Sequence, residues 1–244
     1  MQLDPAILGE FVGTMILILL GNGVVGSVLL AKTKAEGAGW LTITVGWGLA
    51  VFSGVAVSNS MGDKDAHLNP AFTLASVLMT GHAERLYTYI PAQIAGAFAG
   101  AVLIWLFFLP HWAPTSNPAL KFSCFSTTPA IRSYGANFLS ELIGTFVLVL
   151  VAVALVSRRI APGGVAPGLG PLLIGGVVWS IGLSLGATTG YAINPARDLG
   201  PRLAHSLLPI PGKGASDWAY SWIPIFGPLC GGAIAAAFIR FAGI

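Results

Sequence analysis

Long apolar segments without charged side chains alternate with short polar breaks along the chain. The charge-free runs at residues 40–62, 86–111, 160–196 and 218–239 each exceed the about 20 residues that cross a bilayer as an α-helix. The pattern therefore predicts an all-α membrane protein with six spanning helices. Their expected ranges are about 5–31, 40–60, 86–109, 136–157, 167–187 and 219–241.

Two further segments are too short and too interrupted to cross a bilayer. They run from Asn69 to about residue 80 and from Asn194 to about residue 206, and each begins with Asn-Pro-Ala. Asparagine is a favoured helix N-cap, and proline is favoured directly after it because its missing N–H is not needed there. Both segments are predicted to be half-helices that follow an irregular loop. A third Asn-Pro-Ala, at residues 117–119, has no apolar segment after it and is interpreted as coincidence.

The two halves of the chain resemble each other. Residues 6–14 share leucine, glutamate, glycine and threonine in register with residues 137–145, and residues 67–71 match residues 192–196. Each half holds three spans and one half-helix in the same order, so the second copy is inserted upside down. Inverted repeats whose broken helices meet at the bilayer midplane form substrate pathways. The predicted organisation is one channel domain (1–244) with repeats at about 5–109 and 136–241 and a connecting loop at about 110–135.

Composition supports a membrane protein and excludes several other classes. Hydrophobic residues make up 55% of the 244 residues and charged residues 9%, whereas soluble domains carry about 25% charge. The net charge of +3 is small and the basic residues are scattered, so nucleic-acid binding is not indicated. Cys124 and Cys230 are too few for a disulfide framework or a metal cluster, and no cofactor is expected. Residues 1–5 lack the basic start of a cleavable signal peptide, so the first apolar run is expected to remain in the membrane.

Two inverted half-helices that meet end to end create a distinctive chemical environment. Each N-terminus contributes about half a positive charge, and Asn69 and Asn194 add amide donors. Such a centre repels cations and orients a passing water so that a proton wire is interrupted. Irregular backbone at this depth must be buried in protein or line a watery cavity, so the loops before the asparagines are expected to present carbonyl acceptors. These carbonyls belong to Asp65, Ala66, His67, Gly190, Tyr191 and Ala192.

The duplicated Asn-Pro-Ala and the paired glutamates Glu10 and Glu141 carry a family resemblance. On these residues the chain resembles the major intrinsic proteins, or aquaporin superfamily, over essentially its whole length. The resemblance implies six tilted helices and two half-helices, one pore per subunit, a homotetramer and cytoplasmic termini. It assigns the central constriction to Asn69, Pro70, Ala71, Asn194, Pro195 and Ala196.

Several positions resemble the glycerol-facilitator, or aquaglyceroporin, branch of that family. Asp198 directly follows the arginine after the second Asn-Pro-Ala, and Arg202, Pro224 and Ile225 fit the same subgroup pattern. Water-specific relatives usually place a histidine opposite the arginine, where this chain has Gly182. The narrow filter of the family carries over onto Trp47, Gly182, Tyr191 and Arg197.

The chemistry of these filter residues suits a polyol. The rings of Trp47 and Tyr191 can accept a carbon backbone, while Arg197 donates to hydroxyls and opposes cations and protons. The alternative for Arg197 is a snorkelling side chain at a helix end. The alternative for Trp47 is an anchor at the membrane interface, although Trp40, at the start of the same span, fits that role better.

The chain departs from the family pattern at two places. Tyr191 replaces the phenylalanine common in glycerol facilitators, and its hydroxyl makes the filter more polar, which favours solutes such as undissociated lactic acid. The run at residues 62–67 before the first half-helix is more charged and longer than usual. Its charges are expected to form a solvated lip at the inner mouth.

Glu10 and Glu141 are ionisable groups inside apolar spans, and such groups indicate function. We expect each carboxylate to accept backbone N–H groups from the loop before a half-helix and so to hold the carbonyls of that loop toward the pore. A proton relay is the alternative, but no chain of further titratable partners accompanies these residues.

These features together predict a passive channel for small uncharged solutes (glycerol, similar polyols and urea) and water that excludes protons and ions. The alternatives are a channel for undissociated lactic acid or another small neutral acid, and a mainly water-selective channel. A secondary transporter also uses inverted repeats, but it would need a coupling-ion site. An enzyme would need a nucleophile–base pair or a metal cluster, which the sequence does not suggest. Short termini and loops favour a bacterial plasma membrane, with lipid, water and solutes as partners.

Overall fold

The computed structural model describes residues 4–244, so residues 1–3 of the N-terminal stretch without a signal-peptide pattern lie outside it. Within the described residues the chain forms helices and no strand, which confirms the all-α prediction. The long helices are α1 (Pro5–Leu29), α2 (Gly39–Ser60), α4 (Glu84–Phe107), α7 (Tyr134–Val156) and α10 (Trp222–Ala242). The shorter helices are α3 (Pro70–Thr80), α5 (Leu109–Trp112), α6 (Pro118–Ser123), α8 (Leu169–Ser184) and α9 (Pro195–Leu207).

Five of the six predicted spans are helices long and apolar enough to cross a membrane. The sixth, α8, has 16 residues and is shorter than the predicted range of 167–187. It begins after Gly168, whose φ of 80° lies outside the helical range. It ends at Ser184, because residues 185–189 form a turn that leads toward Tyr191. The first three residues of that turn, Leu185, Gly186 and Ala187, carry no polar side chain, so hydropathy alone extended the predicted span.

The half-helices α3 and α9 begin where the two Asn-Pro-Ala signatures predicted. Asn69 and Asn194 both adopt extended backbone with φ of −155° and accept backbone N–H groups of the first turn through Oδ1. Proline occupies the first position of each helix. The third Asn-Pro-Ala is an ordinary helix start, where Asn117 caps α6 in the same way. That helix has only six residues.

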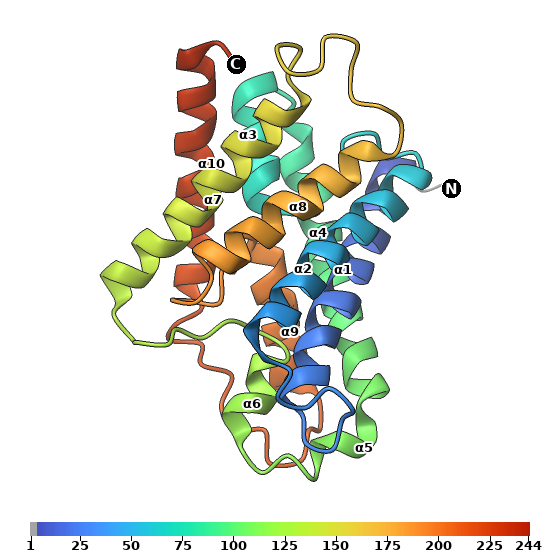
Figure 1. Cartoon of the computed structure of the whole chain (residues 1–244), viewed down its shortest axis with the longest axis vertical. Helices are drawn as coiled ribbons and strands as arrows, with labels where there is room; N and C mark the ends of the chain where they lie inside the picture. The colour runs from blue at the N-terminus through green and yellow to red at the C-terminus, as the bar shows by residue number, and fades with distance from the viewer. Residues whose placement is uncertain (1–3) are drawn as a thin grey trace.

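The helices of the two halves interlock (Figure 1). Helix α1 packs against α2 and α4, α7 packs against α10, and α2 packs against α8 across the two halves. The half-helices pack mainly against the opposite repeat, α3 on α10 and α9 on α4. The start of α1 and the C-terminus lie toward one end of the molecule, hereafter the terminal end, while α5 and α6 lie at the opposite end, hereafter the loop end (Figure 1). The arrangement brings the first turns of α3 and α9 together in the middle.

Candidate functional site

A cavity of about 670 Å³ leads from the terminal end into the middle of the molecule. Charged and polar side chains line its mouth, namely Asn59, Lys64, Asp65, His82 and Arg85. Apolar side chains from several helices form much of its wall, including Leu17, Val51, Val55, Phe72, Leu148 and Val178. Asn69 and Asn194 lie along it, and Trp47, Tyr191 and Arg197 lie where it ends. The two asparagines and three of the four predicted filter residues thus line one cavity, whereas Gly182 does not line it.

The two asparagines of the central constriction connect the two halves. Asn69 Nδ2 donates to the Ile193 carbonyl at 2.8 Å, and Asn194 Nδ2 donates to the Leu68 carbonyl, also at 2.8 Å. An amide group carries two N–H donors, so each asparagine retains one that these bonds do not use. Neither side chain is fully enclosed, because each residue keeps 6% of its surface exposed. The remaining four residues of the constriction, Pro70, Ala71, Pro195 and Ala196, are buried in the first turns.

The loops that precede the half-helices have the same unusual backbone in both halves. Ala66 and Leu68 have φ of 42° and 52°, and Tyr191 and Ile193 have φ of 37° and 43°. Side chains disfavour this left-handed region, at a cost of about 1–3 kcal/mol per residue. Five of the six residues predicted to supply pore carbonyls lie along the cavity, whereas Gly190 does not. Such strained loops require specific support from their surroundings.

That support comes from the two buried glutamates. Glu10 accepts the backbone N–H groups of His67 at 2.6 Å and Leu68 at 2.7 Å, and its Oε2 also accepts the Gln93 side-chain amide at 2.8 Å. Glu141 repeats the arrangement in the second half with the N–H groups of Ala192 (3.0 Å) and Ile193 (2.9 Å). Backbone groups buried in a membrane protein must find such partners.

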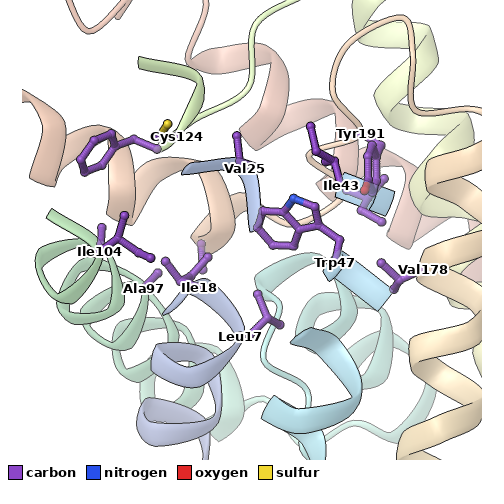
Figure 2. Packing of buried hydrophobic residues seen from close by; sticks show 14 of the residues in the cluster. Leu17, Ile18, Val25, Ile43, Trp47, Ala97, Ile104, Cys124, Val178 and Tyr191 are labelled. Carbon is purple, nitrogen blue, oxygen red and sulfur yellow. The ribbon is translucent and has the colours of Figure 1, made fainter. Parts of the chain in front are cut away.

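The filter arginine stacks on the filter tryptophan. The guanidinium carbon of Arg197 lies 4.1 Å from the centroid of the Trp47 ring, and its Nη1 donates to the Phe125 carbonyl at 3.1 Å. Trp47 itself packs flat on α1 at Gly21, where a Cβ would come within 2.3 Å of the indole. Figure 2 shows this indole surrounded by Leu17, Val25, Ile43 and Tyr191. Trp47 is 4% exposed, so the structure places it inside the molecule and not at a membrane interface.

The Tyr191 ring occupies the space that the missing side chain of Gly182 leaves; these two residues are called the small side of the filter. A Cβ at Gly182 would lie 2.9 Å from both Cζ and Oη of Tyr191, so glycine at this position lets the phenol approach α8. The Tyr191 hydroxyl is buried and has no hydrogen-bond partner among residues 4–244. A buried hydroxyl without a partner is costly.

A buried ion pair fixes the connecting loop beside the filter. Asp198 pairs with Arg202 at 2.7 Å and accepts both the backbone N–H and the hydroxyl of Thr127 at 2.8 Å. Arg202 also donates to the Thr127 carbonyl at 3.2 Å. This clamp holds the stretch of loop that contains Phe125, whose carbonyl orients Arg197. Of the four subgroup markers, Asp198 and Arg202 therefore adjoin the filter, whereas Pro224 and Ile225 lie on α10 and do not line the cavity.

Three residues near the filter were not identified from the sequence. Asn22 donates to the Phe125 carbonyl at 3.2 Å, so this carbonyl accepts from both Asn22 and Arg197. A polar residue inside the first apolar span was a signal for Asn22, but nothing in the sequence pointed to Phe125. Trp40 was assigned to the membrane interface, yet its indole N–H donates to the Gly182 carbonyl at 3.1 Å.

The charged run at the inner mouth is only partly the solvated lip that the sequence suggested. Asp63 is fully buried and accepts the Ser58 hydroxyl at 2.8 Å and the Asp65 N–H at 3.3 Å. Asp65 forms an ion pair with Arg85 across the mouth. The prediction was wrong for Asp63 because a carboxylate can act as a local backbone cap as well as a surface charge. Within residues 4–244 no group of three His, Cys, Asp or Glu side chains forms a metal site.

Comparisons with known proteins agree with the geometry. The chain matches the family model described as Major intrinsic protein over residues 1–239. It is 52% identical over 231 residues to a probable glycerol uptake facilitator protein of Thermotoga maritima, covering 94% of this chain and 96% of that protein. It is also 52% identical over 241 residues to glycerol uptake facilitator protein 3 of Lactiplantibacillus plantarum, covering 97% of each.

A solved structure shows the same architecture. The aquaglyceroporin from Plasmodium falciparum superposes with a TM-score of 0.83 at 28% identity, covering 96% of this chain and 94% of that one. The matches therefore extend over the helices, the half-helices and the filter together. The chain belongs to the major intrinsic protein family.

Proposed function

We propose that this membrane protein is a passive channel for glycerol and similar small uncharged solutes, urea included, and for water. The observation that carries the proposal is the end of the cavity, where Arg197 stacks on Trp47 and Tyr191 lies against Gly182. Two aromatic rings offer an apolar surface to the carbons of a polyol, and the guanidinium offers donors to its hydroxyls. The similarity to glycerol uptake facilitators supports this choice of solute.

The charges along the path support exclusion of cations and protons. Arg197 forms no ion pair among the described residues, because the neighbouring Asp198 pairs with Arg202. A fixed positive charge therefore stands at the constriction without a counter-ion from residues 4–244. Farther along the path, the first turns of α3 and α9 add two helix N-termini, each of which favours anions over cations. The free amide hydrogens of Asn69 and Asn194 orient a passing water by its oxygen.

The two glutamates complete the pathway as supports. Glu10 and Glu141 hold the strained loops so that successive carbonyls accept from the passing solute. In this role the carboxylates take no part in proton transfer. A membrane-embedded reaction is not part of the proposal, and neither is ion-coupled transport, because both glutamates are already occupied by backbone N–H groups.

Membership of the family supports a proposal for assembly and location. The proposal places a homotetramer, with one pore per subunit, in a bacterial plasma membrane with both termini in the cytoplasm. Large apolar side chains exposed on the outside of the helices, among them Leu41, Phe107, Leu139 and Leu172, suit contact with lipid or with another subunit.

Stopped-flow light scattering on liposomes that contain the purified protein tests the proposal. Liposomes are exposed to an impermeant osmolyte, to glycerol, and to lactic acid below its pKa. Re-swelling in glycerol that empty liposomes lack is the expected result. Rapid shrinkage in the impermeant osmolyte without re-swelling in glycerol would contradict the proposal and indicate a mainly water-selective channel.

A second candidate is a channel that prefers undissociated lactic acid, in which the unpartnered Tyr191 hydroxyl, buried in this structure, turns toward the solute. A carboxylic acid has both a donor and an acceptor for this hydroxyl. The variant Tyr191→Phe removes the hydroxyl and keeps the ring. If lactic acid is preferred, entry of the acid should fall relative to glycerol in this variant. An unchanged ranking of the two solutes would rule out a role for the hydroxyl.

A further inference from the structure

Trp40 is not one of the predicted filter residues, but its side chain contacts two of them. It lies in the first turn of α2, and its indole N–H donates to the Gly182 carbonyl of α8 at 3.1 Å. Its ring meets the Tyr191 ring edge to face, with the centroids 5.8 Å apart and the planes at 79°. A single side chain thus contacts both residues that form the small side of the filter.

The position of the Tyr191 ring depends on packing. Its hydroxyl has no hydrogen-bond partner among residues 4–244, so no polar contact within this part of the chain fixes the end of the phenol. Glycines stand on one side of the ring, since a Cβ at Gly182 or Gly186 would come within 2.9 or 2.4 Å of it. These glycines leave room for the Tyr191 ring but have no side chain that packs against it and fixes its position. Trp40 supplies an edge-to-face contact, a geometry that aromatic pairs prefer.

The hydrogen bond of Trp40 distinguishes it from an interface anchor. A tryptophan at a membrane interface directs its N–H toward water or lipid headgroups, whereas the N–H of Trp40 is used inside the protein. Trp222 provides the contrast. It also lies in the first turn of a long helix and is 41% exposed, against 38% for Trp40, but it stacks on Tyr134 and Phe138 instead of a predicted filter residue. Neither tryptophan lines the cavity itself.

We propose that Trp40 is a positioning residue that determines the solute specificity of the channel by holding the Tyr191 ring against Gly182. The inference rests on the proposed channel function and adds a residue that sets the width of its filter. Without Trp40, the Tyr191 ring is free to move away from its place beside Gly182. The filter then admits larger polyols that the wild-type filter retards, while water passes in both cases.

The test compares Trp40→Leu, Trp40→Phe and the matched control Trp222→Leu in proteoliposomes. Permeabilities to water, glycerol and the four-carbon polyol erythritol are measured for each. Trp40→Leu should lower the glycerol-to-erythritol ratio by about two- to tenfold, the range expected when one edge-to-face pair is lost. Trp40→Phe, which keeps a ring but loses the N–H donor, should fall between wild type and Trp40→Leu. Trp222→Leu should leave the ratio unchanged.

A purely structural role would scale the permeability to every solute by one factor, and that result would overturn the proposal. A double-mutant cycle with Tyr191→Ala tests the positioning directly. In the Tyr191→Ala background, Trp40→Leu should have no further effect on the ratio, because the ring that Trp40 holds is absent. A full effect of Trp40→Leu in that background would overturn the assignment. If wild-type liposomes pass neither polyol faster than empty ones, the proposed channel function fails instead.

Discussion

The loops that lead into the two half-helices share a backbone but differ in side chains. Both loops contain two non-glycine residues with positive φ, both end in an asparagine cap, and both donate two N–H groups to a buried glutamate. The side chains around this common frame diverge. Three residues after the asparagine, the first half has Phe72 and the second has Arg197, and three residues before it they have Ala66 and Tyr191.

The difference shows how a duplicated frame acquires one selective end. On the side of the first half the cavity is wide and opens between Lys64 and Arg85. On the side of the second half the larger side chains close it, with the Arg197 guanidinium stacked on Trp47. In the proposed channel, the frame of glutamates and asparagines therefore positions the path in both halves, and selection among solutes is concentrated in the second.

The largest expected effect concerns the fourth residue after each asparagine, which is Thr73 in the first half and Asp198 in the second. Asp198→Asn leaves the fully buried Arg202 without its counter-charge, which costs about 3–5 kcal/mol. Thr73→Val removes the neutral hydroxyl that bonds to His67 and Gln93, at about 1–3 kcal/mol. Denaturation in detergent should therefore show the greater loss of stability for Asp198→Asn. Equal losses would mean that the clamp beside the filter is no stronger than the neutral network of the first half.

The next effect concerns ion exclusion. Arg197→Ala removes the fixed charge at the constriction and should raise cation or proton leak by about tenfold or more, which corresponds to a barrier lowered by about 1.4 kcal/mol. The equivalent change in the first half, Phe72→Ala, should leave the leak at its wild-type level. A pH-sensitive dye inside liposomes under a pH gradient reports the leak. Equal leak in the two variants would show that the halves share the exclusion of ions.

The smallest effect is expected at the inner mouth. Arg85 and Asp65 form an ion pair with side chains 20% and 44% exposed, and exposed pairs contribute about 0–1 kcal/mol. Arg85→Ala should therefore change glycerol permeability by less than about fivefold. The same re-swelling assay measures it. A tenfold change would place a second selective point at the inner mouth and would end the distinction between the two halves.

Much of the fold and of the candidate site could be predicted from the sequence, because motifs that occur at matching positions in both halves are more specific than single motifs. The repeated Asn-Pro-Ala located both half-helices, and paired glutamates inside apolar spans indicated buried groups with a structural purpose. The end of α8 was missed because the turn after Ser184 begins with three residues that have no polar side chain. The contacts around Arg197 were missed for a different reason. Phe125 acts through its backbone carbonyl, and no side-chain pattern reveals which carbonyl of the connecting loop will face the filter.

The sequence pattern also did not predict the tertiary contacts of two residues. Trp40 looked like an interface tryptophan because it begins a span, and only the packing of α2 on α8 brings it to Gly182. Asp63 looked like a surface charge because it lies in a charged run, but the fold buries it against Ser58. In each case the residue type was informative and the tertiary partner decided its place.

The most direct test of the central claim, that the filter of the second half selects the solute, is the glycerol permeability of Gly182→Val. A side chain at Gly182 meets the Tyr191 ring, whereas one at Gly176 on the same helix finds nothing within 4 Å. Gly176→Val therefore controls for the cost of a β-branched residue in α8. The account predicts that Gly182→Val reduces glycerol entry to the level of empty liposomes and that Gly176→Val retains it, with both proteins equally folded. Wild-type glycerol entry through Gly182→Val would contradict the account.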